Sequence, residues 1–314
     1  MTTKTLFNKG GAKELRQSVH NDRRGEELAE AIVEHFNQIN SLNIWADKEI
    51  ETLLLRQKEY EVWKLDQKPT YPKQFAKFSP SSADSCEREL FFKNLKMPRD
   101  PDEMTAWQRR WTENSTGVHE ARQRNLLYAE KYLEKPMFKV VRIKDPENPM
   151  RDGLPAWEKP LEDWKQIKHK DIDLVETGMM DGILEYKDGT QIGFEFKTKS
   201  NSVAQIKQII KSGKPAPHHR KQCVAYSILF GINEFVLVYE AVAKDKWGTK
   251  QGGRQDLTAF YVKVTEKQRQ QLLDKWAKVA EGVETGEMPK GDNKKCMFCQ
   301  WKLECAKFTG GIRE

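Results

Sequence analysis

The chain has 314 residues, of which 38% are hydrophobic and 32% are charged. This length suffices for one large domain, or for a domain with an appendage, and the low apolar fraction predicts an extensive solvated surface. The first twenty residues contain no apolar stretch, and no run of about eighteen apolar residues occurs. We therefore expect neither a secretory signal nor a membrane-spanning helix. The net charge of +7 makes nucleic acid the leading class of partner.

Helical patterns dominate the N-terminal region. Apolar residues recur at spacings of three and four over Glu26–Asn40 and Asp47–Lys64. Pro69 and Pro72 interrupt this pattern and predict a linker. We therefore expect a helical N-terminal extension over residues 1–70 and a second unit over residues 71–314.

Further helices are expected at the start of the second unit. The Ser79-Pro80 pair predicts a helix that begins near Pro80 and carries Cys86. A longer helical pattern covers Thr105–Leu133, with His119 in its middle. A short strand over Met137–Ile143 and a proline-rich, charged loop up to residue 170 are expected to follow.

The centre of the chain alternates strands with helices. A hairpin turn is predicted at Asp188-Gly189, and helices are predicted over His218–Phe230 and Glu266–Val283. The expected strands are Met180–Tyr186, Gln191–Lys197, Glu234–Ala241 and Ala259–Val264. This order predicts an α/β fold in which helices flank a central mixed sheet.

The hairpin carries a candidate site for a cation. Glu195 and Lys197 are two residues apart on one strand, so their side chains share a face, and the hairpin brings Asp181 to a similar height. Two converging carboxylates suit Mg²⁺ or Mn²⁺, and a lysine beside them completes a site for phosphodiester cleavage. The motif alone is weak, because such residues alternate on many half-exposed strands.

Four cysteines suggest a second metal site. Cys296, Cys299 and Cys305 lie close together near the C-terminus, and Cys86 lies about two hundred residues earlier. Four thiolates suit tetrahedral zinc or an iron–sulfur cluster, and the spacing does not choose between them. The odd number of five cysteines, without a secretory signal, favours a reducing, cytoplasmic location. The fifth, Cys223, is expected to be a buried apolar residue.

Together these motifs resemble the PD-(D/E)XK nuclease superfamily, and in particular its RecB-like branch with a four-cysteine iron–sulfur cluster. That branch includes the AddB nuclease domain and CRISPR-associated exonucleases. The resemblance covers residues 79–308 and rests on these segments: Ser79-Pro-Ser-Ser with Cys86, Gly117-Val-His119-Glu, Asp181-Gly-Ile-Leu, Glu195-Phe-Lys197, Gln222-Cys-Val-Ala-Tyr226 and the three C-terminal cysteines. One departure is Glu87-Arg88, where the family often has proline and then a basic residue.

The resemblance implies a restriction-endonuclease-like core and a role for each matched residue. His119, Asp181, Glu195 and the carbonyl of Phe196 would bind the Mg²⁺ or Mn²⁺ ion, and Lys197 would be the catalytic lysine. Gln222 and Tyr226, with His219 before them, would face the DNA. The four cysteines would hold a 4Fe–4S cluster.

Basic residues cluster from Lys207 to Lys221, before and into the start of the helix over His218–Phe230. Arg220 and Lys221 belong to this cluster and are predicted to contact the phosphate backbone, although a solvated face is the alternative. We therefore predict a metal-dependent DNA exonuclease that prefers single strands or DNA ends and acts in recombination, repair or replication, in a phage or a bacterium. No GxxxxGK[ST] motif is present, so a helicase or recombination partner would do any unwinding. The alternatives are an RNA-directed nuclease and a non-catalytic DNA-binding or scaffolding module with structural zinc.

Overall fold

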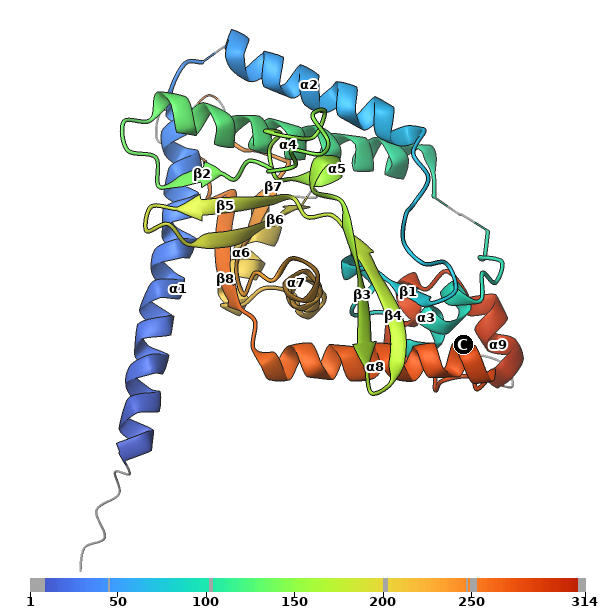
Figure 1. Cartoon of the computed structure of the whole chain (residues 1–314). Helices are drawn as coiled ribbons and strands as arrows, with labels where there is room; N and C mark the ends of the chain where they lie inside the picture. Colours follow the sequence, from blue (N-terminus) through green and yellow to red (C-terminus); the bar gives the residue numbers. More distant parts are fainter. Residues whose placement is uncertain are drawn as a thin grey trace, which may run out of the picture.

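Two β-sheets of unequal size form the frame of the structure. The computed structural model describes residues 9–44, 46–101, 104–199, 203–246, 248 and 253–309. A five-stranded sheet has the order β2-β5-β6-β7-β8, and a three-stranded sheet has the order β1-β4-β3. Figure 1 shows helix α7 (Pro217–Phe230) between the two sheets, and helix α8 (Glu266–Thr285) running beside the three-stranded sheet.

The five-stranded sheet is mixed. Strands β5 and β6 form an antiparallel hairpin, β6 and β7 are parallel, and β7 and β8 are antiparallel. The parallel pair needs a crossover connection, which here contains α6 (Val203–Ser212) and α7. The strands are β2 Phe138–Val140, β5 Gly182–Tyr186, β6 Gln191–Lys199, β7 Glu234–Ala241 and β8 Leu257–Lys263. The predicted α/β class, with a mixed sheet flanked by helices, is confirmed.

The three-stranded sheet contradicts the expectation of a loop up to residue 170. It comprises β1 (Ala76–Phe78), β3 (Asp163–His169) and β4 (Ile172–Gly178). Strand β3 is mostly polar and largely exposed, so it lacks a run of buried apolar residues. The turn into β4 holds Lys170 and Asp171 at positive φ angles of 49° and 63°. The usual Asn-Gly or Asp-Gly signal for such a turn is absent, so nothing in the sequence marks this hairpin.

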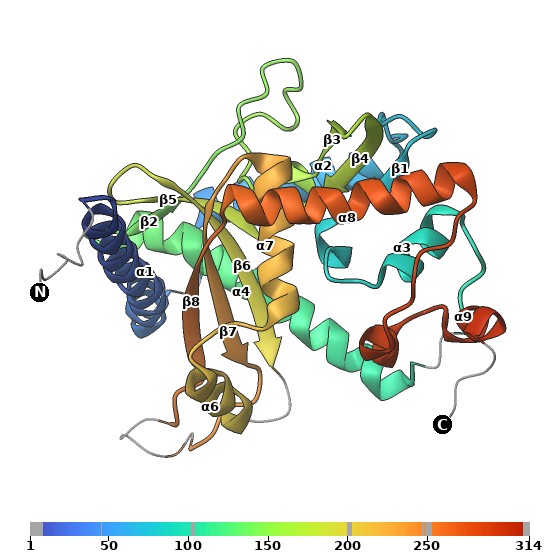
Figure 2. The ribbon, with the colours of Figure 1, turned by 90° about the horizontal axis from the view of Figure 1, so that it is seen from below.

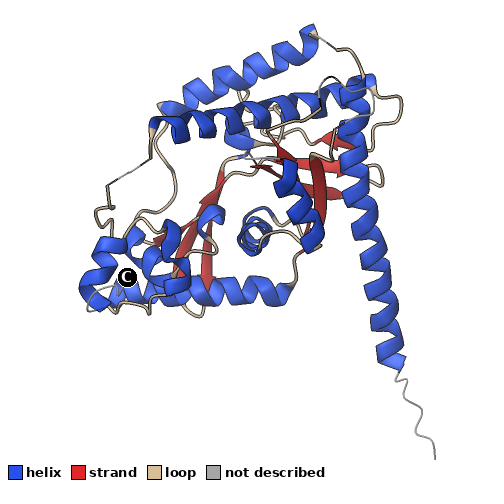
Figure 3. Ribbon diagram, turned by 180° about the vertical axis from the view of Figure 1, so that it is seen from behind, coloured by secondary structure: helices blue, strands red, loops and turns tan. Residues whose placement is uncertain are grey.

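Helices from the N-terminal region belong to the main core. Helices α1 (Lys9–Ser41) and α4 (Ala106–Tyr132) pack on one face of the five-stranded sheet, and α2 (Lys48–Leu65) lies over α4 (Figures 1 and 3). Leu28, Ile32 and Phe36 of α1 are buried in one cluster with Phe194 and Val238 of the sheet. The predicted helical N-terminal segment is confirmed, and its division from the rest near residue 70 stays a prediction. None of the described helices is long and apolar enough to cross a lipid bilayer.

The helix predicted from Pro80 through Cys86 is wrong in its boundaries. A 3₁₀ turn, η1, covers Pro80–Ser82, and helix α3 begins only at Glu87, with Cys86 as its N-cap residue. The hydroxyl of Ser82 donates to the carbonyl of Ser79 at 3.0 Å. Such local serine bonds compete with helical hydrogen bonding, so the chain turns before α3 (Glu87–Asn94) starts.

A buried carboxyl group lies between the three-stranded sheet and its helices. Glu176 on β4 is 0% exposed, and neither carboxyl oxygen has a hydrogen-bond partner among the described residues. Burial raises the pKa of Glu176 well above its ordinary value, and the charge of Lys165 on the neighbouring strand opposes this only in part. The native state therefore keeps Glu176 protonated at pH values where the unfolded chain has lost the proton.

We expect Glu176→Gln to change how stability depends on pH. Because the folded pKa is above the unfolded value, the native state binds more protons, and wild-type stability falls as pH rises above about 4.5. The free energy of unfolding of the variant, relative to wild type, should therefore increase between pH 4.5 and pH 8, by about 1 kcal/mol or more. Urea titrations at the two pH values measure this, and a constant difference would contradict it.

Candidate active site

Asp181 is held at the junction of two strands. It immediately precedes β5, beyond the last paired position, Gly182 opposite Phe194. Its Oδ2 atom accepts a hydrogen bond of 2.8 Å from the backbone N–H of Phe196 on β6. The Asp181 side chain is 16% exposed. The hairpin thus brings this carboxylate beside the middle of β6, as its sequence predicts.

Glu195 and Lys197 point from β6 to the side on which α7 lies. Their side chains form an ion pair, and Glu195 is 1% exposed. Burial, reinforced by the charge of Asp181, raises the pKa of Glu195 to about 7. Burial also raises the pKa of Asp181 to about 7, against the opposing effect of Lys197. Burial lowers the pKa of Lys197, but the charges of Glu195 and Asp181 outweigh it and leave that pKa raised.

His119 reaches the same place from α4. Its Nδ1 atom lies 3.8 Å from Asp181 Oδ2, and its ring meets that of Phe196 edge to face, with centroids 5.0 Å apart. Burial, and next the charge of Lys197, lower the pKa of His119. The imidazole is therefore neutral at pH 7, which is the form that binds a metal ion.

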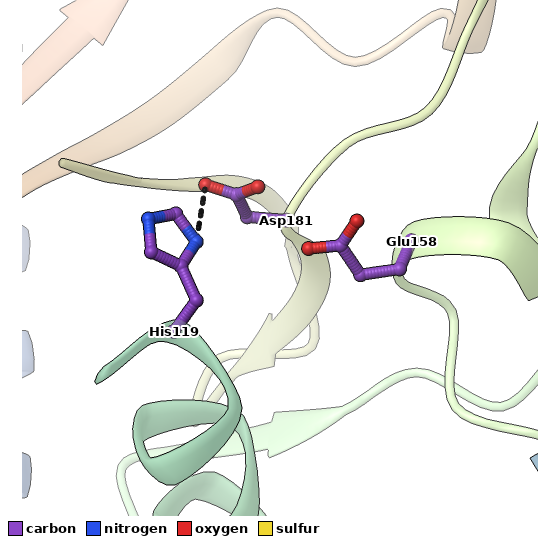
Figure 4. A group of neighbouring side chains, drawn as sticks. All are labelled: His119, Glu158 and Asp181. Atoms are coloured by element: carbon purple, nitrogen blue, oxygen red, sulfur yellow. Dashed lines mark ion pairs between the residues drawn. The ribbon is translucent and has the colours of Figure 1, made fainter. Parts of the chain in front are cut away.

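Glu158 is a site residue that the sequence did not indicate. Figure 4 shows its carboxylate directed toward Asp181, opposite His119. One ligand atom from each of these three residues lies within 4.8 Å of the others. Glu158 begins the short helix α5 (Glu158–Leu161) and has a φ of +45°, which is uncommon outside glycine. The Glu158 backbone N–H donates to the carbonyl of Met180 at 2.8 Å. This hydrogen bond holds Glu158 beside Asp181, the residue after Met180.

Two glutamine side chains support this arrangement. Gln123, one helical turn after His119, donates from Nε2 to the carbonyl of Asp181 at 3.0 Å and to Glu158 Oε1 at 3.4 Å. Gln57 on α2 accepts a 2.7 Å hydrogen bond from the indole Nε1 of the fully buried Trp157. Because Trp157 directly precedes Glu158, α2 helps to fix the position of α5. Helices α2, α4 and α5 also line a cavity of about 430 Å³ that includes His119 and Glu158.

The donor set fits a hard divalent cation. Glu158 and Asp181 bring two carboxylates together with His119, and the buried carboxylate of Glu195 is near enough for its charge to raise the pKa of Glu158, after the larger effect of burial. Lys197 is the cation paired with them, and Glu195 Oε2 is buried without a hydrogen-bond partner in the described chain. Carboxylate oxygens and a neutral imidazole are ligands that Mg²⁺ or Mn²⁺ accepts. A bound cation would satisfy this oxygen and remove the repulsion between the carboxylates.

The residues of helix α7 that were predicted to contact DNA lie on two different faces of the helix. The Gln222 Nε2 donates to the Tyr226 hydroxyl at 2.7 Å, and burial and then the charge of Glu195 raise the pKa of Tyr226. His219 is buried against Tyr239, with its Nδ1 atom 2.7 Å from that hydroxyl. These side chains lie on the face of α7 turned toward the five-stranded sheet.

Arg220 and Lys221 do not share that face. They line a separate cavity of about 370 Å³ between α7 and α8. Lys221 also forms an ion pair of 2.6 Å with Asp84. The reason is helical geometry, since positions 220 and 222 are about 200° apart around an α-helix. The predicted contact of these two residues with a nucleic-acid backbone stays a prediction.

The start of α3, where Cys86 lies, contacts the C-terminal segment that carries the other three predicted cysteine ligands. Cys86 accepts a 3.1 Å hydrogen bond from the N–H of Asp292, next to the turn η2 (Asn293–Phe298), and Cys305 lies on α9 (Lys302–Thr309). Burial, and then the charges of Cys305 and Cys86, raise the pKa of Cys296. Burial raises the pKa of Cys299 to about 11. The remote thiol and the C-terminal thiols are thus neighbours.

The spacing of these sulfur atoms is wider than a single zinc ion requires. Tetrahedral zinc with Zn–S bonds of about 2.3 Å holds its sulfurs about 3.8 Å apart. No three cysteine sulfurs of the described chain lie within 4.8 Å of one another. Arg88, where the sequence departs from the family pattern, donates to Cys305 Sγ at 3.4 Å and to the carbonyl of Pro289 at 3.0 Å. The fifth cysteine, Cys223, is fully buried, as expected.

Comparisons with known proteins give only distant similarities. No protein-family profile matches the chain, and no curated protein matches it. The solved structure of SSO0001 is similar, with 15% identity over 82% of this chain and 97% of that chain, at a TM-score of 0.38. The alkaline exonuclease LHK-Exo from Laribacter hongkongensis shows 15% identity over 68% of this chain and 90% of that chain, at a TM-score of 0.40. Similarities at such low TM-scores do not indicate a function. The function is therefore inferred from the candidate active site alone.

We expect Mn²⁺ to stabilise the protein through this site. At a concentration 100 times its Kd, a cation that binds only the native state adds about 2.7 kcal/mol to the free energy of unfolding. Asp181→Asn should abolish the resulting rise in melting temperature. Glu185→Gln, which alters an exposed carboxylate on the same strand, should retain it.

The affinity for Mn²⁺ should increase as pH rises from 6 to 8. The pKa values of Asp181 and Glu195 are raised to about 7, so both carboxyl groups must lose their protons before they bind the cation. Isothermal titration in buffers with different ionisation enthalpies measures the affinity and the protons released. An affinity that is constant over this range would contradict the assignment of these two ligands.

Proposed function

We propose that this chain is a divalent-metal-dependent nuclease that hydrolyses phosphodiester bonds in DNA. The observation that carries the proposal is the meeting of His119, Glu158 and Asp181 within 4.8 Å, beside the buried Glu195 and the Lys197 that is paired with it. Buried carboxylates with raised pKa values, grouped beside a lysine, are costly for a fold and typical of a catalytic site.

The roles of the residues follow from their chemistry. His119, Glu158, Asp181 and Glu195 would hold a Mg²⁺ or Mn²⁺ ion, which supplies Lewis-acid activation of the phosphoryl group and of water when bound. The Phe196 N–H bonds to Asp181, and in an extended strand the carbonyl of the same residue points to the same edge. The Phe196 carbonyl is therefore proposed as a further ligand.

Lys197 stabilises charge during hydrolysis. A water oxygen forms a bond to phosphorus while the bond from phosphorus to the leaving oxygen breaks. A carboxylate of the site takes the proton from the water, and the leaving oxygen gains a proton. The Lys197 ammonium group, which the raised pKa keeps charged, lies where negative charge develops on the phosphoryl oxygens.

We also propose the finer features that the family resemblance implies. These are exonucleolytic action, preference for single strands or ends, a DNA substrate rather than RNA, and a place in recombination, repair or replication. Gln222 and Tyr226 support the proposal by their position, because Tyr226 lies between Gln222 and the charge of Glu195. The cytoplasmic location and the helicase or recombination partner stay predictions.

For the cysteines we propose a 4Fe–4S cluster with a structural role. The support is the contact of Cys86 with the C-terminal segment, in which its Sγ atom accepts from the N–H of Asp292, and the four thiolates suit such a cluster. The cluster would tie α3 to the C-terminal segment. A zinc site within a non-catalytic DNA-binding module remains the second candidate, and the buried, incompletely paired carboxylates of the hairpin argue against it.

We expect Lys197→Ala to lower the rate of Mn²⁺-dependent DNA hydrolysis by at least 100-fold, in the range found for removal of one charge-stabilising group. Mn²⁺ binding should persist, because the proposed ligands remain. Lys139→Ala, an exposed lysine on β2 of the same sheet, should leave the rate unchanged.

The substrates for this assay are end-labelled linear DNA and circular single-stranded DNA. Resistance of the circle supports exonuclease action, and its cleavage would show endonuclease action. Equal rates for Lys197→Ala and wild type would show that the site is assigned wrongly.

The proposed cluster predicts a brown protein when purification excludes oxygen. Cys86→Ser should lose the broad visible absorption and lower the thermal stability, because the tie between α3 and the C-terminal segment is lost. Cys223→Ala, a cysteine remote from the other four, should keep the colour. Colourless wild type with one equivalent of zinc by elemental analysis would favour the zinc alternative.

A further inference from the structure

The N-terminal half of α4 projects from the body of the protein. Its buried residues all lie in the second half: Gln123, Leu126, Leu127, Tyr128 and Ala129. Residues 106–122 include none that is buried. Figure 2 shows this half of the helix running past the ends of β6 and β7. The core that supports the rest of α4 therefore does not extend under its first three turns.

Two tryptophans lie on this projecting segment. Trp107 is 54% exposed, and Trp111, one turn later, is partly exposed. Their ring centroids are 5.7 Å apart with an interplanar angle of 30°. Tryptophan is normally well buried, and neither indole contributes to a buried core cluster of the described chain. The pair thus offers aromatic surface that the fold itself does not use.

The tryptophans lie on the same helix as His119. Trp107, Trp111, Ser115 and His119 follow one another at four-residue intervals, so each neighbours the next in a stripe that winds by about 120° around α4 between Trp107 and His119. With a rise of 1.5 Å per residue, Trp111 lies about 12 Å and Trp107 about 18 Å along the helix axis from His119. A chain that extends from the cation site along this stripe meets both indoles within a few nucleotides.

The net charge near the two tryptophans is positive, which favours a polyanionic ligand. Arg110 is exposed and lies about 60° around the helix from Trp107, while residues 106–118 contain one acidic residue, Glu113. Guanidinium groups neutralise phosphates and also stack on bases. Aromatic side chains beside basic groups are the elements with which proteins bind single-stranded nucleic acid.

We propose that Trp107 and Trp111 form a stacking platform for unpaired bases of a single-stranded nucleic acid, with its phosphates near Arg110. Bases in a duplex already stack on one another and present only their edges in the grooves, so indole faces bind unpaired bases. The platform would guide the strand toward His119 and the cation. This inference rests on the nuclease proposed above and assigns the substrate class of the same site.

Equilibrium binding without hydrolysis tests the platform. Fluorescence anisotropy with labelled (dT)₁₅, (rU)₁₅ and a hairpin duplex, in EDTA, gives a Kd for each nucleic acid. Trp107→Ala/Trp111→Ala should weaken binding of the single strands by about 10-fold to 100-fold, the range expected for lost base stacking. The loss should be smaller for the duplex, and the DNA and RNA arms show which backbone is preferred. Trp107→Phe/Trp111→Phe should retain most of the affinity, because phenylalanine also stacks.

The matched control removes a partly exposed tryptophan elsewhere. Trp164 lies on β3 of the three-stranded sheet, and its indole N–H donates to the Thr70 hydroxyl at 2.9 Å. Trp164→Ala should bind (dT)₁₅ like wild type. Melting temperatures of all variants show whether they fold, and the exposed positions of residues 107 and 111 predict small changes.

Three results would overturn the platform. The first is equal affinity of wild type and the double alanine variant for single strands, and the second is an equal loss for single strands and duplex. The third is a change of oligomeric state in the variant by light scattering, which would make the pair a contact between protein chains. If wild type hydrolyses DNA but the variant binds normally, the platform alone is wrong. If wild type neither binds nor hydrolyses nucleic acid, the proposed function fails with it.

Discussion

The mutual repulsion of buried carboxylates at the end of one hairpin is the constraint on which the site depends. Asp181 and Glu195 have pKa values raised to about 7 by burial, and each raises the electrostatic cost of charging the other. Lys197 offsets this in part through its ion pair with Glu195. A divalent cation would remove the remaining repulsion between the carboxylates. The free energy that these buried charges cost without a cation therefore favours metal binding.

The surrounding fold holds these groups together against their repulsion. The backbone of Phe196 bonds to Asp181, and the amide of Gln123 bonds to the carbonyl of Asp181. Glu158 adds a positive φ angle and a backbone bond to the residue before Asp181. Backbone geometry of this kind persists only where neighbouring structure determines it. Here that neighbour includes α2, which fixes Trp157 through Gln57.

The N-terminal helices thus have a part in the site that their sequence does not show. Their amphipathic patterns predict helices, and helices α1 and α2 are present. Their partners are not predictable from those patterns, because an apolar stripe specifies burial without specifying the surface that buries it. In the structure, α1 covers the sheet behind the hairpin, and α2 forms a wall of the cavity at His119 and Glu158.

The sequence by itself determined the long helices α1, α2, α4, α7 and α8, the strands of the large sheet and the hairpin with Asp181, Glu195 and Lys197. These depend on local periodicity, on a turn signal and on short motif spacing. Only the tertiary structure decided the three-stranded sheet, the start of α3 after Cys86, and the place of Glu158 beside Asp181. It also placed Cys86 against the C-terminal segment. The small sheet, the place of Glu158 and the place of Cys86 depend on contacts between segments far apart in the chain, which local pattern does not encode.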